Sequence, residues 1–264
     1  MQTNILSTNR PFSWKLFFLL WIMTILGLIA VIPYTLTLQS NLLAKIQLPI
    51  PLPVLILIQI SFNSIFIGFL VGIGLLLASK SGLGLPYMEN RLLGRQKPFD
   101  FKRVLIFSVL VGIVSALVLS AFDEWLFLPL MARHGISFPE NVIPPAWQGF
   151  LASFYGGITE EVLLRLFLLT LFAWLGWHFT RKKYERPTLI ILWISNILAA
   201  IIFGLGHFPG VLSMEIPLNF VVITRTLFLN GLAGLVFGWL YFTYGLESAM
   251  IAHFSADIML HVFL

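Results

Sequence analysis

The chain has 264 residues, of which 59% are hydrophobic and only 10% charged, and its mean hydropathy is +0.95. A soluble domain carries roughly 25% charged residues, so this composition excludes an ordinary soluble protein. The net charge of +5 does not indicate a nucleic-acid partner, because the basic residues lie between the apolar stretches. The absence of cysteine excludes disulfides, redox dithiols and thiolate metal sites.

Long apolar stretches predict an all-α, polytopic transmembrane bundle of about seven helices, forming a single membrane domain over residues 1–264. The first stretch is longer than a signal-peptide core and lacks a clear cleavage site, so we expect it to be retained. An apolar segment, Trp125–Met131, is expected to lie on the membrane surface, and an additional span over 124–136 would raise the count to eight. The predicted spans are residues 16–34, 54–79, 104–122, 148–178, 188–206, 219–244 and 248–264.

Basic residues are unevenly distributed over the connections between these spans. Seven spans with a cytoplasmic N-terminus place twelve Lys and Arg residues on the cytoplasmic side and two, Lys45 and Arg133, outside. We expect an integral protein of the bacterial plasma membrane, in contact with its lipids. Because basic residues concentrate in cytoplasmic connections, its N-terminus is expected to lie in the cytoplasm. The twelve are Arg10, Lys15, Lys80, Arg91, Arg95, Lys97, Lys102, Arg103, Arg181, Lys182, Lys183 and Arg186.

The predicted fourth span contains two adjacent carboxylates, Glu160 and Glu161, and an arginine, Arg165. A charge at bilayer depth costs a few kcal/mol or more, so these groups are expected to face protein or a wet cavity. Residues four apart share a helix face, so Glu161 is expected to pair with Arg165. Glu160 lies about 100° away and is the candidate base. The alternative is that all three form one structural ion-pair cluster.

Histidines occur in or beside two further spans. His207 follows the end of the fifth predicted span, and Phe203, on the same face, is expected to pack against its imidazole. In the seventh span Asp257 lies four residues after His253, where its carboxylate can orient the imidazole. His261 continues that face but lies near the C-terminus, so we do not expect it to have a catalytic role.

A glutamate and two histidines inside a bilayer indicate water activation by one of two routes. Glu160 acts as a general base while a histidine positions the water, or zinc is bound by His207, His253 and a carboxylate. The chain contains neither an HExxH helix nor a GxSxG turn, which excludes a zincin and a nucleophile-elbow hydrolase.

Three short patterns stand in order on three predicted spans. They are Glu160-Glu161-x-x-x-Arg165, Phe203-x-x-x-His207 and His253-x-x-x-Asp257, the last preceded by the run Gly-Leu-Glu-Ser-Ala-Met-Ile-Ala at 245–252. Together they resemble the CPBP family of intramembrane proteases, also called CAAX proteases or the Abi family. The resemblance covers about residues 148–260, the part that carries the catalytic motifs.

The resemblance implies a membrane endopeptidase whose substrate is a peptide or protein, lipidated in the case of eukaryotic relatives. It assigns water activation to Glu160 and His207 and the oxyanion site to His253 and Asp257, while the ion pair of the first motif would hold that motif together. Metallo and metal-free glutamate mechanisms have both been proposed for the family. We favour the metal-free one, with no required cofactor; the alternative is zinc held by Glu160, His207 and His253.

Two features depart from this scheme. The family often has Asn where this chain has Asp257, and an ionised Asp cannot donate a hydrogen bond to an oxyanion; it must be protonated or orient His253 instead. The second is depth, since Glu160 lies roughly 18 Å from the outer end of its predicted helix and His253 roughly 10 Å from the inner start of its own. With His207 near an outer end, straight helices would not bring the three together without other boundaries or glycine-rich bends.

Two other classes of protein fit the same residues. One is a non-enzymatic membrane immunity or scaffold protein with the same fold, and the other is a proton-coupled transporter using Glu160, Arg165, Arg225 and Asp257. The absence of an internal repeat argues against the transporter. Arg225, in the sixth predicted span, is expected to be a structural counter-ion of Asp257 or Glu215.

Overall fold

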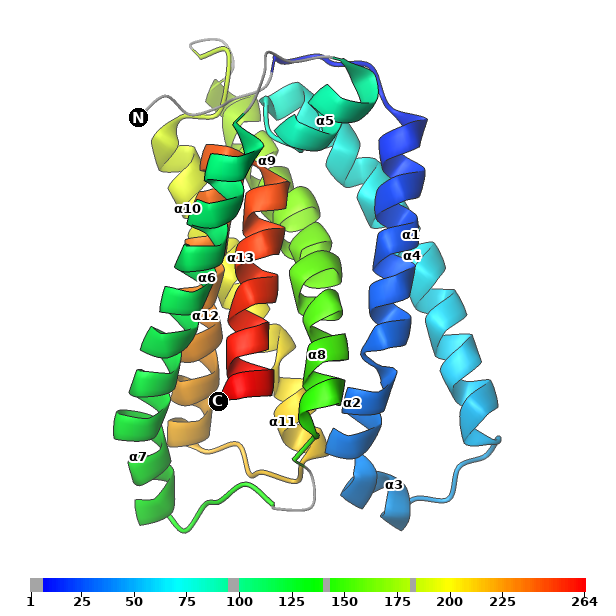
Figure 1. Ribbon diagram of the computed structural model, residues 1–264, viewed down its shortest axis with the longest axis vertical. Coiled ribbons are helices and arrows are strands. Elements are labelled where there is room, and N and C mark those ends of the chain that lie inside the picture. Colours follow the sequence, from blue (N-terminus) through cyan, green and yellow to red (C-terminus); the bar gives the residue numbers. More distant parts are fainter. Residues whose placement is uncertain (1–6, 95–99, 140–142, 181–183) are drawn as a thin grey trace.

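The computed structural model describes residues 7–94, 100–139, 143–180 and 184–264, and these are all-helical. Figure 1 shows the helices running side by side along one long axis, as a transmembrane bundle of about seven spans requires. Within the described residues, six helical segments are long and apolar enough to cross a membrane. They are Trp14–Leu38, Leu52–Ser81, Phe101–Arg133, Ala146–Thr180, Leu189–Ser213 and Phe220–Tyr244.

The seventh helix, α13, packs in the middle of the bundle against the third, fourth and sixth spans. Its alanines at 249, 252 and 256 are almost fully buried, and such small residues let neighbouring helices approach closely. The elements in chain order are α1 (Trp14–Ala30), α2 (Ile32–Leu38), α3 (Ser40–Lys45), α4 (Leu52–Ser81), α5 (Pro86–Leu93), α6 (Phe101–Phe122), η1 (Asp123–Phe127), α7 (Leu128–Arg133), α8 (Ala146–Phe154), η3 (Tyr155–Glu160), η4 (Val162–Leu169), α9 (Thr170–Thr180), α10 (Leu189–Gly206), α11 (Phe208–Ser213), α12 (Phe220–Tyr244), α13 (Leu246–Ile258) and η5 (Met259–Phe263), where η denotes π-helix.

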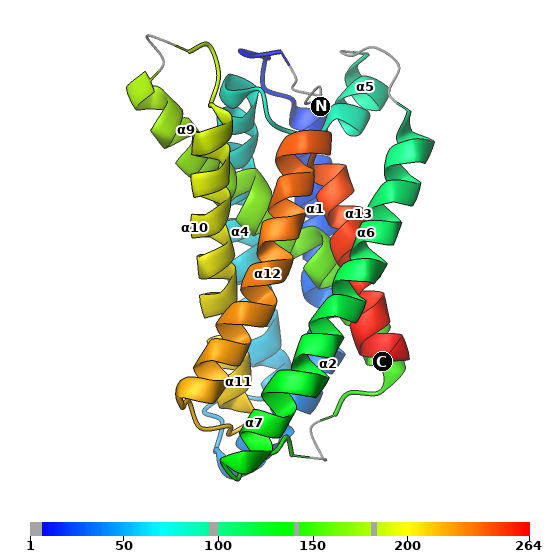
Figure 2. The same ribbon diagram turned by 90° about the vertical axis from the view of Figure 1, so that its left-hand side faces the viewer.

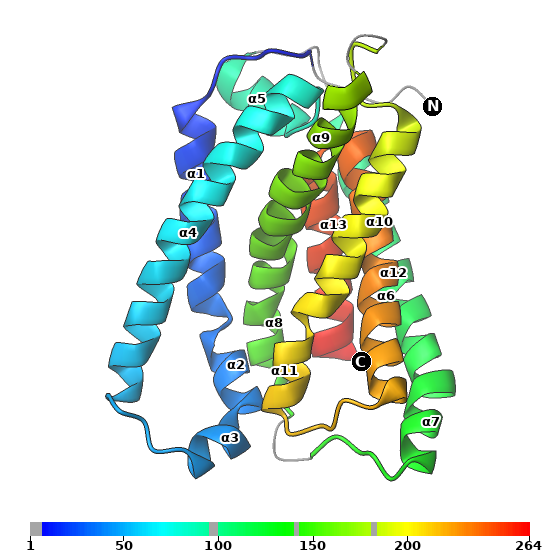
Figure 3. The same ribbon diagram turned by 180° about the vertical axis from the view of Figure 1, so that it is seen from behind.

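Large apolar side chains cover the outer surface of the bundle, as expected where lipid replaces water as the solvent. Figure 3 shows the first half of α4 leaning away from α8, and this half exposes Leu57, Phe62 and Ile65 by 64%, 69% and 74%. Burial begins at Ile67, where α4 meets α1 and the fourth span. Along its length, α4 therefore divides into a first half that faces lipid and a second half that packs against other helices.

The third span is longer than expected. α6 continues without a break through the π-helical η1 into α7, so the segment Trp125–Met131 extends a spanning helix. The prediction that it lies flat on the membrane surface is wrong, and the described residues contain no separate span at 124–136. Its run of apolar residues continues the hydrophobicity of α6, which makes prolongation of the helix cheaper than a turn.

The fourth span changes its winding at the charged motif. π-Helical segments η3 and η4 lie on either side of Glu161, between regular α-helix in α8 and α9. π-Helical turns are rare and concentrate at functional sites, because the wider turn redirects side chains. The span is thus continuous from Ala146 to Thr180, and no glycine-rich break interrupts it.

The fifth span also reaches further than its predicted end. α10 stops at Gly206, and the short helix α11 then carries the chain onward to Ser213, so His207 lies at a junction inside the span. The expected mismatch in depth between His207 and Glu160 came from placing the outer end of this span at residue 206. Extending it to 213 moves His207 into the bundle.

Gly157 determines how closely the fourth span approaches α13. A Cβ atom on Gly157 would lie 2.7 Å from Cβ of Phe254 and 3.1 Å from the carbonyl oxygen of Met250. A side chain at this position would therefore push the fourth span away from α13. By contrast, a Cβ on Gly231 in α12 would meet no atom within 4 Å.

Replacing Gly157 by leucine is expected to lower the free energy of unfolding by about 1–3 kcal/mol, because the added side chain overpacks the contact with α13. Thermal unfolding of the purified protein in detergent measures the effect. Gly231→Leu, a change of the same size in open space, serves as the control. Equal melting temperatures for the two variants would show that the approach of these helices is not close-packed.

Candidate active site

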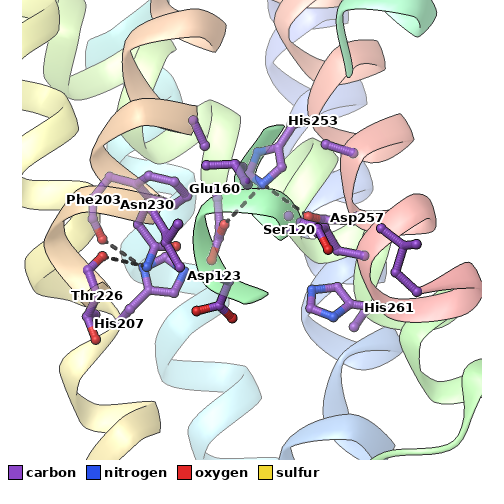
Figure 4. A pocket seen from close by; sticks show the side chains of 18 of the residues that line it. Ser120, Asp123, Glu160, Phe203, His207, Thr226, Asn230, His253, Asp257 and His261 are labelled. Atoms are coloured by element: carbon purple, nitrogen blue, oxygen red, sulfur yellow. Dashed lines mark hydrogen bonds and ion pairs between the residues drawn. The ribbon is translucent and has the colours of Figure 1, made fainter. Parts of the chain in front are cut away.

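One cavity of about 620 Å³ brings together the residues of all three sequence motifs. Glu160 reaches it from the end of η3, His207 from the junction of α10 and α11, and His253 and Asp257 from α13. Figure 4 shows Glu160 between the two histidines, with Asp257 beyond His253. The side chains that sequence analysis placed in separate spans thus share one chamber inside the bundle.

The imidazole of His253 is held by a neighbouring carboxylate and an aromatic ring. Its Nδ1 lies 2.7 Å from Oε1 of Glu161, and the ring of Phe237 stacks on it with centroids 4.7 Å apart. Because an ionised carboxylate only accepts hydrogen bonds, Nδ1 carries the hydrogen and Nε2 faces the cavity. We expected Asp257 to orient this imidazole; Glu161 binds Nδ1, and Asp257 lies on the Nε2 side of the ring.

Glu161 and Arg165 form the ion pair that their spacing predicts. Arg165 Nη1 lies 2.9 Å from Glu161 Oε1, and both side chains are buried, with exposed fractions of 2% and 0%. The guanidinium also donates to the carbonyl of Gly234 at 3.1 Å and lies over the rings of Phe203 and Phe237. The pair therefore links η4 to α10 and α12, and neither charge contacts lipid.

Glu160 faces the cavity and has no partner on its own helix, as its position relative to Glu161 predicts. Its Oε2 lies 3.8 Å from Nε2 of His253, and its side chain is 20% exposed. The two adjacent glutamates thus approach opposite nitrogens of one imidazole. One is a buried structural carboxylate, and the other is open to solvent in the cavity.

Asp257 lies on the cavity side of His253. Its Oδ1 is 3.5 Å from Nε2 of that ring, and its side chain is 14% exposed. A Cβ atom on Gly156 would collide with Oδ2 of Asp257 and come within 3.2 Å of Nε2 of His253. Glycine at 156 is therefore required for η3 and α13 to meet at the site, a role that sequence analysis missed. The sequence did contain a signal for this close contact: the pair Gly156-Gly157 lies within a predicted span, shortly before the two glutamates.

His207 is oriented by the backbone of its own helix. Its Nδ1 donates to the carbonyl oxygen of Phe203 at 2.8 Å, and the Phe203 ring meets the imidazole edge-on with centroids 4.7 Å apart. The expectation that Phe203 holds this imidazole is confirmed. With Nδ1 engaged as a donor, Nε2 of the neutral ring is a hydrogen-bond acceptor.

Arg225 does not pair with either expected carboxylate. Its Nε and Nη2 bind the two carboxylate oxygens of Asp123 at 2.6 and 2.5 Å, while Glu215 pairs with Lys45 at 2.6 Å. The prediction was wrong because it treated Asp123 as a loop residue, whereas the prolonged third helix brings it beside α12. His261 lines the same cavity, and its Nδ1 lies 3.4 Å from the hydroxyl of Tyr34.

The zinc alternative can be compared with this arrangement. Within the described residues, no three His, Cys, Asp or Glu side chains form a group that could hold a metal ion. Nδ1 of His207 and Nδ1 of His253 are each engaged by an acceptor, which leaves Nε2 of each ring toward the cavity; metal-binding histidines use their second nitrogen in the same way. Glu160, His207 and His253 do not form such a group among the described residues, and the steps proposed below follow the metal-free route.

Residues 142–259 match the family model described as Type II CAAX prenyl endopeptidase Rce1-like. This match supports the resemblance to the CPBP, or CAAX-protease, family over residues 142–259. No curated protein and no solved structure matches the chain. The matched region contains the whole charged motif of the fourth span, His207, His253 and Asp257. The three sequence motifs of the matched region therefore coincide with the walls of the central cavity.

Replacing Glu161 by glutamine is expected to cost about 3–5 kcal/mol of stability, because it leaves the buried guanidinium of Arg165 without its counter-charge. The same change at Glu215, whose ion pair with Lys45 is exposed, should cost about 1 kcal/mol or less. Thermal or denaturant unfolding in detergent measures both. Similar losses for the two variants would contradict the structural role assigned to Glu161.

Proposed function

We propose that the protein is an intramembrane endopeptidase in which Glu160 and His207 activate a water molecule for attack on a peptide carbonyl. The observation that carries the proposal is the convergence of ionisable groups from three spans on one chamber of about 620 Å³ that contains Glu160. Ionisable residues inside a membrane domain are functional by default, since each is costly to keep there. The match of residues 142–259 to a CAAX prenyl endopeptidase family model supports hydrolysis of a peptide bond as the reaction.

Glu160 acts first as base and then as acid. It takes a proton from water while the water oxygen bonds to the carbonyl carbon, and it then returns that proton to the departing amine as the C–N bond breaks. His207 positions the water, because Nε2 accepts a hydrogen bond while Nδ1 is fixed to the Phe203 carbonyl. The products are a free carboxylic acid and an amine.

His253 and Asp257 line the site where the carbonyl oxygen becomes negatively charged. In its protonated form, His253 donates Nδ1–H to Glu161 and directs Nε2–H into the cavity, toward the developing oxyanion. Asp257, 3.5 Å from Nε2, orients that hydrogen without donating one itself. This proposed role is compatible with Asp at a position where the family often has Asn.

The substrate is a peptide or protein segment at the membrane. A cavity of about 620 Å³ falls in the range typical of sites that enclose small ligands, roughly 300–1,000 Å³, and accommodates a few residues of an extended peptide. Prenylation of the substrate belongs to the description of the matched family. For this chain a lipid group on the substrate is part of the proposal, and we place the protein in the bacterial plasma membrane with a cytoplasmic N-terminus.

Glu160→Gln keeps the shape of the side chain but removes the base, so proteolysis should fall roughly 10²- to 10⁴-fold. Mass spectrometry is used to compare peptide termini in three kinds of cells: cells that lack this protein, cells that make the native protein and cells that make the variant. Glu185→Gln, at an exposed position far from the cavity, is the control. Termini that persist unchanged with Glu160→Gln and His207→Ala would sink the peptidase and favour a non-enzymatic immunity or scaffold protein.

Asp257→Asn is expected to retain activity within roughly tenfold, because the amide oxygen still orients His253 and the amide N–H can reach the oxyanion. Asp257→Leu removes the oxygen that orients His253 and supplies no donor, so it should cost roughly 10²- to 10³-fold. The peptide termini identified above provide the readout. Equal loss in both variants would show that the carboxylate charge itself is required.

A further inference from the structure

Basic residues and the cavity lie at opposite ends of the bundle. Figures 1 and 2 show α5 at one end and α3, α7 and α11 at the other. Among the residues that the structure describes, those in the connections and helix ends on the α5 side are Arg10, Lys15, Lys80, Arg91, Lys102, Arg103 and Arg186. The other end has Lys45 and Arg133, and the charge of Lys45 is offset by its ion pair with Glu215. The bundle is therefore strongly polarised in charge along its long axis.

The cavity opens at the end that is poor in basic residues. Its inner wall consists of buried side chains, among them Phe203, Phe237 and His253. Its wall also includes Glu124 and Leu128, which are exposed and belong to η1 and α7, at the end opposite α5. Hydrolysis consumes water, and in this arrangement water reaches Glu160 from the α7 side.

The distribution of basic residues determines the direction in which such a bundle inserts. Short connections rich in Lys and Arg remain on the cytoplasmic side, and these residues near the helix ends dominate the choice of orientation. Among the described residues, seven Lys and Arg residues lie at the α5 end and two at the α7 end. Helix α5 and the segment around Arg186 both contribute to this excess. The α5 end is then cytoplasmic, and the α7 end faces outward.

From these two observations we infer that the catalytic cavity opens on the extracytoplasmic face of the membrane and takes polypeptide segments exposed on that face. Its substrates are exported peptides or outward-facing segments of membrane proteins, and tails of cytoplasmic proteins are excluded. The statement about substrates rests on the proposed peptidase function, whereas the direction of the opening does not. A reaction that delivers the substrate must therefore be export or membrane insertion of a polypeptide.

The absence of cysteine in the native chain makes the direction directly measurable. Single cysteines replace Leu92 in α5, Ala132 in α7 and Ser120 in the cavity wall. Leu92 and Ala132 are exposed. Ser120→Cys is a conservative change, because it only replaces the hydroxyl oxygen by sulfur. Intact cells whose outer membrane has been removed are treated with a charged, membrane-impermeant thiol reagent, and labelling is compared with that after lysis.

Cysteines at 132 and 120 are expected to react in intact cells to the same extent as after lysis, and the cysteine at 92 only after lysis. Labelling at 92 with protection at 132 would invert the bundle and overturn the inference. Labelling at 132 with protection at 120 would show that the cavity does not open outward. Both readouts are independent of catalysis, so they also apply to a Glu160→Gln background in which the peptidase proposal is tested separately.

The substrate half of the inference has its own test. Peptide termini that disappear with Glu160→Gln should map to exported proteins or to outward-facing segments of membrane proteins. Termini that map to cytoplasmic proteins would overturn this half while leaving the peptidase intact. Outward labelling without any Glu160-dependent termini would instead remove the proposed function and leave the direction of the cavity standing.

Discussion

The carboxylate of Glu161 holds together the helices that build the site. Its Oε1 lies 2.9 Å from Arg165 Nη1 and 2.7 Å from His253 Nδ1, and the side chain is completely buried. Arg165 in turn contacts the backbone of α12 and the Phe203 ring of α10. In a bilayer each of these groups alone would be too costly to bury, so they remain there only as a connected set.

This network also explains how adjacent glutamates acquire different surroundings. Glu161 turns toward the protein interior, while Glu160, the next residue, opens to the cavity at 20% exposure. The π-helical winding around Glu161 and the glycines at 156 and 157 let the span approach α13 closely enough for both carboxylates to reach one imidazole. Structural support and an exposed reactive group are therefore supplied by the same short segment.

Aromatic rings complete the support. Phe203 holds His207 through its carbonyl and its ring, and it also lies 5.1 Å below the guanidinium of Arg165. Phe237 stacks on His253 and approaches the same guanidinium from α12. Each histidine thus has one nitrogen and one aromatic contact committed to the protein, and its other nitrogen is left for the cavity. The arrangement keeps two imidazoles in defined orientations within the cavity.

Much of this protein follows from its sequence alone. Hydrophobic stretches predicted the spans, because only a helix satisfies its own backbone within lipid, and the spacing of Glu161 and Arg165 predicted their ion pair. Contacts between distant residues have no such signature. That Glu161 orients His253, 92 residues away, and that Asp123 pairs with Arg225, 102 residues away, was decided by helix packing. Packing also placed His207 at the depth of Glu160, since the end of a helix in lipid depends on its neighbours as well as on its own hydrophobicity.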